Sequence, residues 1–169
     1  MIRPATPDDV PDLVRLVREL AVYEKEPEAA QASEQDLREA LFPTDGEPAV
    51  YADVAETDGR VVGMAVWFLT FSTWTGRHGI WLEDLFVEPA HRGSGLGKAL
   101  LATLARRCVE RGYTRLEWTV LDWNAPAIGF YRSIGADPLA AWTSQRLDGA
   151  ALEELANHGP FRNRSAADR

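Results

Sequence analysis

Two adjacent carboxylates, Glu83 and Asp84, interrupt an otherwise apolar run at residues 80–87. Such a run is typical of a buried strand, and burying two unpaired carboxylates in it would cost on the order of several kcal/mol. A substrate, a buried arginine or solvent must therefore contact them. Because desolvation raises the pKa of a carboxylate, Glu83 is a candidate to accept a proton.

A glycine-rich loop, residues 92–97, follows this run and opens directly into a helix. Bare backbone N–H groups and the positive end of the helix dipole then point at one spot, an arrangement that binds phosphate. The spacing excludes a P-loop, because only three residues separate Gly93 from Gly97-Lys98. It also excludes the dinucleotide motif Gly-x-Gly-x-x-Gly, because this loop reads Gly-x-Gly-x-Gly.

The loop matches the Arg-x-x-Gly-x-Gly signature of the GNAT acyl-CoA N-acetyltransferases, and the chain resembles this family beyond that motif. Blocks similar to its polyamine (spermidine/spermine) and thialysine branch occur in the family's order from residue 2 to about 136. This ordered set is far more specific than one glycine motif. The blocks are residues 2–6, Glu19-Leu20-Ala21 with Tyr23-Glu24, residues 81–87, Arg92 with Gly95 and Gly97, and Trp123-Asn124-x-Pro126 with Phe130-Tyr131.

The resemblance implies acetyl-CoA as the co-substrate. In GNAT enzymes a β-bulge splays the strand at 80–88 from the next strand, and the pantetheine arm bonds the exposed backbone as an added strand. A backbone N–H there polarises the thioester carbonyl, and the loop amides bind the diphosphate. By position, the cofactor-binding residues are Leu85, Phe86, Val87, Arg92, Gly93, Ser94, Gly95, Leu96, Gly97, Lys98, Asn124, Ala125, Pro126, Ala127 and Tyr131.

The resemblance also implies catalytic roles. Glu83 is expected to accept the amine's proton directly or through water; the alternative is a strand carboxylate paired with an arginine. Tyr131 stands where the family has the general acid for the departing thiolate, although its spacing alone describes a half-buried core tyrosine. Tyr23-Glu24 borders the amine site in this branch, although composition alone describes a solvated helix end. The expected substrate-binding residues are Tyr23, Glu24, Trp74, Glu83, Asp84, Glu117, Trp118, Thr119 and Thr143.

The acceptor amine is left open. Ser72, Thr143 and Gln145 replace an acid, a Glu and a Trp of the polyamine enzymes. A diamine, thialysine or an amino-acid-like amine is therefore as good a candidate as a long polyamine. The alternatives are a protein or peptide N-acetyltransferase and a non-catalytic acetyl-CoA-binding regulatory module. A pure binder needs only the loop, so the presence of Glu83 and Tyr131 argues against the module.

The order of elements predicts an α/β (α+β) fold class. Runs at 50–56 and 61–71 form a hairpin around Asp58-Gly59, and the strand at 80–88 extends the meander. With helices between and after the strands, we expect the GNAT fold, a mixed, mostly antiparallel central sheet with helices on both faces. A split is expected between the strand at 80–88 and the strand at 114–121. A short strand pair near 138–147 and a small helix after Asp148 complete the prediction.

With 169 residues, 46% of them apolar, the chain fits one compact domain, expected over residues 1–156 and followed by a disordered tail at 157–169. No window approaches the roughly 18 apolar residues of a membrane span and no targeting signal is recognised, so a cytoplasmic protein is expected. The formal charge of −8 argues against a nucleic-acid partner and suits a cationic substrate.

Three further expectations concern cysteine, metal and assembly. Cys108 is the only cysteine and falls in step with the apolar residues of its helix, so we predict that it packs rather than acts as a nucleophile. His78, His91 and His158 lack the close spacing of zinc ligands, so no metal is expected. The family resemblance implies a homodimer.

Overall fold

A computed structural model gives the fold of this chain and describes residues 1–158. The chain separates into two compact units, Met1–Val120 and Leu121–Arg169. The single domain expected over residues 1–156 stays a prediction. Among residues 1–158, no helix has the length and apolar composition that crossing a membrane requires.

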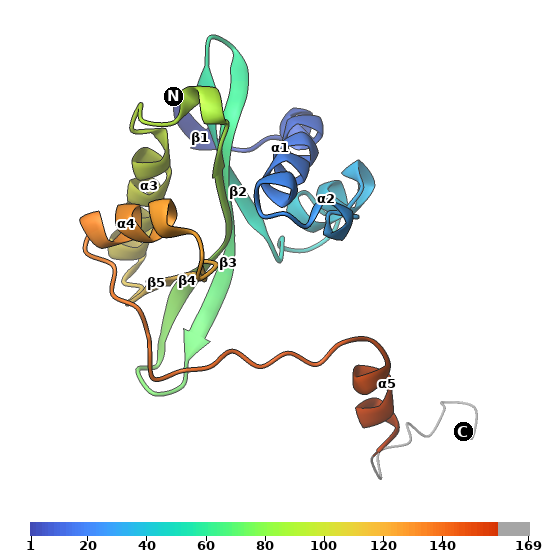
Figure 1. The fold of residues 1–169 in the computed structure, drawn as a ribbon. Coiled ribbons are helices and arrows are strands. Elements are labelled where there is room, and N and C mark those ends of the chain that lie inside the picture. Colours follow the sequence, from blue (N-terminus) through green and yellow to red (C-terminus); the bar gives the residue numbers. More distant parts are fainter. Residues whose placement is uncertain (159–169) are drawn as a thin grey trace. The chain divides into compact units, whose positions relative to one another are not determined.

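The first unit contains a five-stranded sheet in the order β1-β2-β3-β4-β5 (Figure 1). β1 to β4 pair antiparallel with their neighbours, and β5 pairs parallel with β4. The predicted mixed, mostly antiparallel sheet is thus confirmed. The strands are β1 Ile2–Pro4, β2 Tyr51–Thr57, β3 Arg60–Ser72, β4 Arg77–Val87 and β5 Leu116–Glu117.

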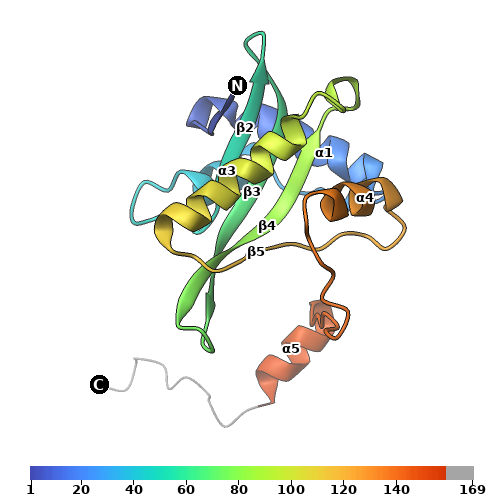
Figure 2. The ribbon, with the colours of Figure 1, turned by 90° about the vertical axis from the view of Figure 1, so that its left-hand side faces the viewer.

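Helices cover both faces of this sheet, as predicted. α1 (Val10–Tyr23) and α2 (Glu34–Leu41) lie on one face and α3 (Leu96–Arg111) on the other (Figures 1 and 2). On the α1 face, Leu13 and Leu16 pack in one core with Met64 and Phe86. α3 ends at Gly112, whose φ of 67° is the left-handed conformation that favours glycine at this position.

Cys108 lies on the buried side of α3 and is 6% exposed. Burial raises the pKa of its thiol, which disfavours the reactive thiolate. The prediction that this cysteine packs in the core is confirmed.

Three single turns of 3-10 helix join these elements, and each begins at a proline. Proline suits the first helical position because its missing N–H would have no helical partner there. The turns are η1 Pro7–Asp9, η2 Pro27–Ala29 and η3 Pro89–His91.

β5 is shorter than predicted. The strand expected at 114–121 is reduced to Leu116–Glu117, and its pairing with β4 ends at Trp81. The reason lies in β4, which becomes irregular just after Trp81 and leaves β5 no regular edge to follow. The predicted split between the two strands therefore begins at this point.

The second unit holds α4 (Ala125–Ser133) and α5 (Gly149–Asn157). The strand pair predicted near 138–147 is wrong, because this segment is neither strand nor helix. Its residues from 139 to 147 are exposed, so no packing partner holds them in an extended ladder. α5 occupies the first residue of the predicted tail, and residues 159–169 lie outside the described part of the chain.

Candidate active site

A β-bulge occurs in β4 at Glu83. Val66 of β3 pairs with Asp84, and the next residue, Trp67, pairs with Leu82, so Glu83 has no partner in the ladder. An extra residue of this kind interrupts the alternation of side chains between the two faces of a sheet. The predicted bulge is confirmed.

The bulge places Glu83 and Asp84 on the same face of the sheet, the face covered by α1. Asp84 pairs with Val66, which packs against the core on the α1 side. Trp81 faces the same side, because its ring lies against that of Phe68, two residues along from Val66. Its indole Nε1 donates to Oε2 of Glu83 at 2.9 Å, which holds Glu83 on this face too.

A third carboxylate, Glu24, belongs to the same electrostatic cluster. The pKa of Asp84 is raised to about 6, first by burial and then by the negative charges of Glu83 and Glu24. Burial also raises the pKa of Glu24. Three carboxylates near one another repel one another and attract a cation.

The sequence prediction made Glu83 the desolvated carboxylate, and this is wrong. Glu83 is exposed, whereas Asp84 is half-buried. The bulge explains why Asp84, and not Glu83, loses contact with solvent. Glu83 is the extra residue and projects toward solvent, while Asp84 takes the regular ladder position opposite Val66. Sequence spacing alone does not reveal which of two neighbouring carboxylates loses its water.

Arg92 of the glycine-rich loop contacts the C-terminal end of α1. Its guanidinium carbon lies 4.6 Å from the ring centroid of Tyr23 and 5.4 Å from that of Phe86, both cation–π distances. Its Nε donates to the backbone oxygen of Val87 at 2.9 Å. The arginine side chain thus joins the end of β4 to the residue that precedes Glu24.

The backbone of the loop depends on glycine, and the helix that follows it begins without a side-chain cap. Gly93 and Gly95 adopt φ values of 77° and 87°, which only glycine adopts readily. No side chain caps the N-terminus of α3 and its first turn has no acidic residue, in contrast to α2, whose cap Ser33 accepts from Asp36 N. Uncapped amides at a helix N-terminus can bind an anion.

Gly97 leaves space beside these amides. A Cβ built on this glycine would meet only Val87 Cγ2, at 4.0 Å. Because its φ is not positive and nothing in the described chain crowds it, neither backbone strain nor packing requires glycine here. The open space is consistent with a diphosphate that approaches the backbone closely.

The outer edge of β4 offers backbone groups for an added strand. In the described chain, β5 pairs with β4 only at Ile80 and Trp81. Glu88 N donates to Val62 O, and the antiparallel alternation then directs the backbone of Phe86 toward β3 and that of Leu85 and Val87 outward. Of the three residues predicted to bond the pantetheine arm, Leu85 and Val87 direct their backbone groups outward and Phe86 does not; the outward oxygen of Val87 accepts from Arg92 Nε.

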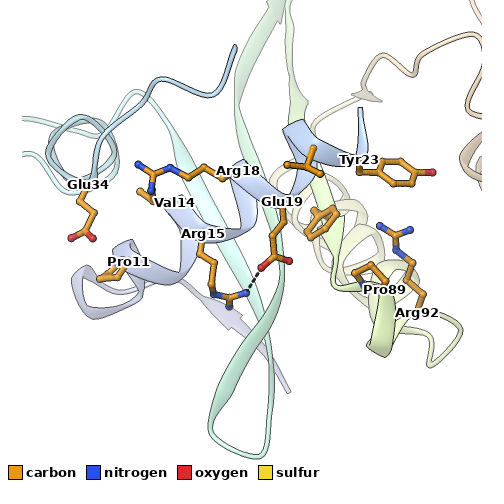
Figure 3. Close-up of a pocket in the computed structure, with 11 residues that line it drawn as sticks. Pro11, Val14, Arg15, Arg18, Glu19, Tyr23, Glu34, Pro89 and Arg92 are labelled. Carbon is orange, nitrogen blue, oxygen red and sulfur yellow. Dashed lines mark hydrogen bonds and ion pairs between the residues drawn. The ribbon is translucent and has the colours of Figure 1, made fainter. Parts of the chain in front are cut away.

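A cavity of about 620 Å³ is lined mainly by α1 and extends to Pro89 and Arg92, where the glycine-rich loop begins (Figure 3). Tyr23 and Arg92 stand close together at one end of it, and Arg15 and Arg18 project from α1 further along. The acidic cluster does not line it. The lining residues are Pro11, Val14, Arg15, Arg18, Glu19, Val22, Tyr23, Glu34, Phe86, Pro89 and Arg92.

The profile of the acetyltransferase (GNAT) family matches residues 14–136. The chain belongs to this family. A thialysine N-epsilon-acetyltransferase of Bos taurus is 37% identical over 168 residues, which cover 92% of this chain and 96% of the relative. An L-ornithine N5-acetyltransferase of Arabidopsis thaliana is 29% identical and covers 91% of this chain and 86% of the relative. The chain is an acetyl-CoA-dependent N-acetyltransferase.

Among solved structures, an integron cassette protein of V. cholerae superposes with a TM-score of 0.77 at 30% identity, over 92% of this chain and 96% of that one. A ribosomal-protein-alanine N-acetyltransferase of Brucella melitensis biovar Abortus 2308 has a TM-score of 0.67 at 23% identity, over 88% of this chain and 98% of that one. The second likeness shows the fold alone.

The acetyltransferase brings one more predicted substrate residue, Glu117, near the cluster. Glu117 pairs with Trp81 in the sheet, and its Oε2 lies 2.8 Å from Arg115 Nε. Trp118 follows it and is half-buried, and Thr119 is exposed.

Trp74 lies elsewhere in the first unit. It is 89% exposed in the turn between β3 and β4. Seven residues of strand, roughly 23 Å at about 3.3 Å each, separate the start of β4 from Asp84. The chain therefore does not bring Trp74 to the acidic cluster.

The remaining predicted residues of the acetyltransferase lie in the second unit. Asn124 is buried and caps α4, its Oδ1 accepting from Ala127 N at 3.3 Å, with Ala125 and Pro126 in the first turn. Tyr131 is half-buried on α4, its ring centroid 5.4 Å from that of Phe130. Thr143 is exposed in the irregular segment.

Sequence reasoning missed one buried polar group beside the loop, Glu88, together with its partners Arg15 and Arg60. Glu88 is 6% exposed. A carboxylate between an apolar strand and Pro89 was the available signal, but its partners lie 73 and 28 residues away in the chain.

Proposed function

We propose that this acetyltransferase transfers the acetyl group of acetyl-CoA to a primary amine of a small molecule, of the class of diamines, polyamines, thialysine and amino-acid-like amines. Relatives named for thialysine and for ornithine, both amino acids with a terminal amine, support this class. The observation that carries the proposal is the bulge at Glu83, which sets two carboxylates on the face where Glu24 adds a third charge.

The acidic cluster binds the amine as its ammonium ion. A cation beside Asp84 and Glu24 offsets the repulsion among the carboxylates, so binding stabilises both partners. Transfer then requires a neutral amine, since the ammonium ion has no lone pair with which to attack the thioester.

Asp84 is the favoured proton acceptor. Its pKa of about 6 lies close to neutral pH, where a general base is both deprotonated and basic enough to act. Glu83 is exposed and contacts water, so of the two roles expected for it from the sequence only acceptance of a proton through water is retained. Asp84 accepts the proton and Glu83 contacts solvent.

The residues that hold acetyl-CoA are those with open backbone groups. The amides of the loop and of the first turn of α3 bind the diphosphate, with Arg92 and Lys98 adding positive charge. Leu85 and Val87 bond the pantetheine arm, and a backbone N–H at the bulge polarises the carbonyl. Acetyl-CoA supplies an acetyl group activated as a thioester, and Tyr131 donates a proton to the thiolate that leaves.

A thiol-release assay with acetyl-CoA tests this function. The panel contains thialysine, ornithine, putrescine, spermidine, lysine and lysine-containing peptides. We expect turnover on at least one small amine, and a fall of about a hundredfold in Asp84→Asn. Glu110→Gln, a carboxylate change on the exposed side of α3, is the matched control and should keep the full rate. Turnover confined to peptides would refute the small-molecule assignment.

A further inference from the structure

Glu88 stands at the boundary between β4 and the glycine-rich loop. Its side chain is 8% exposed. Its backbone N–H donates to Val62 O at 2.9 Å, so the residue is still held by the sheet. The next residue, Pro89, begins the η3 turn that leads to Arg92. Whatever fixes Glu88 therefore fixes the point from which the loop departs.

Two arginines and a histidine from separate parts of the chain surround this carboxylate. Its Oε1 accepts from Arg15 Nη1 of α1 at 2.5 Å and from Arg60 Nη2 at the start of β3 at 2.7 Å. The Nδ1 of His91, on the loop side, lies 3.3 Å from Oε2. A buried carboxylate requires such partners, and the two arginines join α1 and the start of β3 to the residue from which the loop departs.

Arg15 is itself held on several sides. It also donates to Asp12 at 2.8 Å, to Glu19 at 3.0 Å and to the backbone oxygen of Val61 at 2.8 Å. Figure 3 shows the Arg15–Glu19 bond beside the cavity that Arg92 lines at its other end. These bonds fix the position of the Arg15 guanidinium, so the Glu88 carboxylate bonded to it has little freedom to move.

From this geometry we infer that Glu88 is a positioning residue for the diphosphate of acetyl-CoA. It does not touch the ligand; it sets where the loop begins, and so where the amides of residues 93–98 stand. The inference rests on the proposed assignment of that loop to the diphosphate. Amides that bind an anion must be held within a fraction of an ångström, because a misplacement of about 1 Å can cost on the order of a hundredfold.

The test compares two acetyl donors. Acetyl-CoA carries the diphosphate, and S-acetylpantetheine lacks it but keeps the thioester and the arm. In Glu88→Gln, we expect kcat/KM with acetyl-CoA to fall about tenfold through KM, with kcat and the KM of the amine unchanged. The kcat/KM with S-acetylpantetheine should stay within about twofold of wild type, because no diphosphate is involved.

Glu19→Gln is the matched control. It removes a carboxylate that also bonds Arg15, at 3.0 Å, but that has no bond to the loop. Both donors should keep their wild-type constants in this variant. If Glu88→Gln does not fold, Arg60→Met replaces it, since that side chain is 58% exposed and only one bond to Glu88 is lost. A rise of about threefold in the KM of acetyl-CoA alone is then expected.

Two results would overturn the inference. Unchanged constants in Glu88→Gln would show that the loop does not need this carboxylate. Equal losses with both donors, accompanied by a lower Tm, would show a structural role only. Failure of the underlying assignment has a different signature, because the wild-type protein itself would then use S-acetylpantetheine as efficiently as acetyl-CoA.

Discussion

The guanidinium of Arg92 lies over the ring of Tyr23, with 4.6 Å between the guanidinium carbon and the ring centroid. One residue belongs to the loop assigned to the diphosphate and the other immediately precedes Glu24 of the acidic cluster. The contact therefore links the loop assigned to the diphosphate with the acidic cluster, and a substitution of the ring should affect the binding of acetyl-CoA at the loop.

Replacing Tyr23 by Leu removes the ring and should raise the KM of acetyl-CoA about two- to fivefold, the equivalent of a cation–π contact of about 0.5–1 kcal/mol. Tyr23→Phe keeps the ring and should keep the KM. Steady-state kinetics at saturating amine measures both. Equal effects of the two substitutions would show that the hydroxyl, not the ring, matters.

The rate should depend on pH through Asp84. Its pKa of about 6 predicts that kcat/KM falls as the pH drops below 6, where the carboxylate is protonated and accepts nothing. The charge of Glu24 contributes to this raised pKa, so Glu24→Gln should move the acid limb to lower pH. Glu28→Gln, an exposed carboxylate in η2, is the control. An acid limb at the same pH in all three proteins would contradict the coupling.

Asp84 should also make the free protein less stable at neutral pH. Its pKa is raised from 3.8 to about 6 on folding, so between these values the folded protein holds a proton that the unfolded chain has lost. Stability therefore falls as the pH rises through this window, and Asp84→Asn should raise the free energy of unfolding at pH 7 by about 1–3 kcal/mol. Urea titrations at pH 7 and at about pH 3.5 measure this, and the gain should vanish at the lower pH.

The two glycines at the start of α3 should separate folding from binding. Gly97→Ala introduces no strain and should leave the Tm unchanged or slightly higher, yet raise the KM of acetyl-CoA about tenfold by obstructing a charge-assisted hydrogen bond. Gly95→Ala forces alanine to a φ of 87° and should cost about 1–2 kcal/mol of stability as well. Thermal melts and acetyl-CoA titrations report the two effects. A normal KM in Gly97→Ala would place the diphosphate elsewhere.

Tyr131→Phe should lower kcat on the order of a hundredfold, because protonation of the departing thiolate would lose its acid. The KM of acetyl-CoA should change little, since the ring remains. Tyr113→Phe, a half-buried tyrosine of the first unit, is the comparison and should be fully active. An undiminished rate in Tyr131→Phe would remove this tyrosine from the mechanism.

Local sequence determined the parts of this protein that depend on neighbours in the chain. The loop at 92–97 and the helix after it follow from glycine spacing and apolar periodicity, and Gly112 ends α3 because glycine adopts a positive φ easily. The burial of Cys108 follows from its place on the apolar face of the same helix.

Tertiary structure alone decided the electrostatics of the site. The sequence does not show which of Glu83 and Asp84 is buried. The bulge exposes Glu83 and leaves Asp84 beside α1, where burial and the charges of Glu83 and Glu24 raise the pKa of Asp84. Glu88 likewise is bonded to Arg15 and Arg60, which only the packing of α1 and β3 beside β4 brings to it. The free energy of a charge depends on its solvent and its neighbours in space, and those are set by contacts between distant parts of the chain.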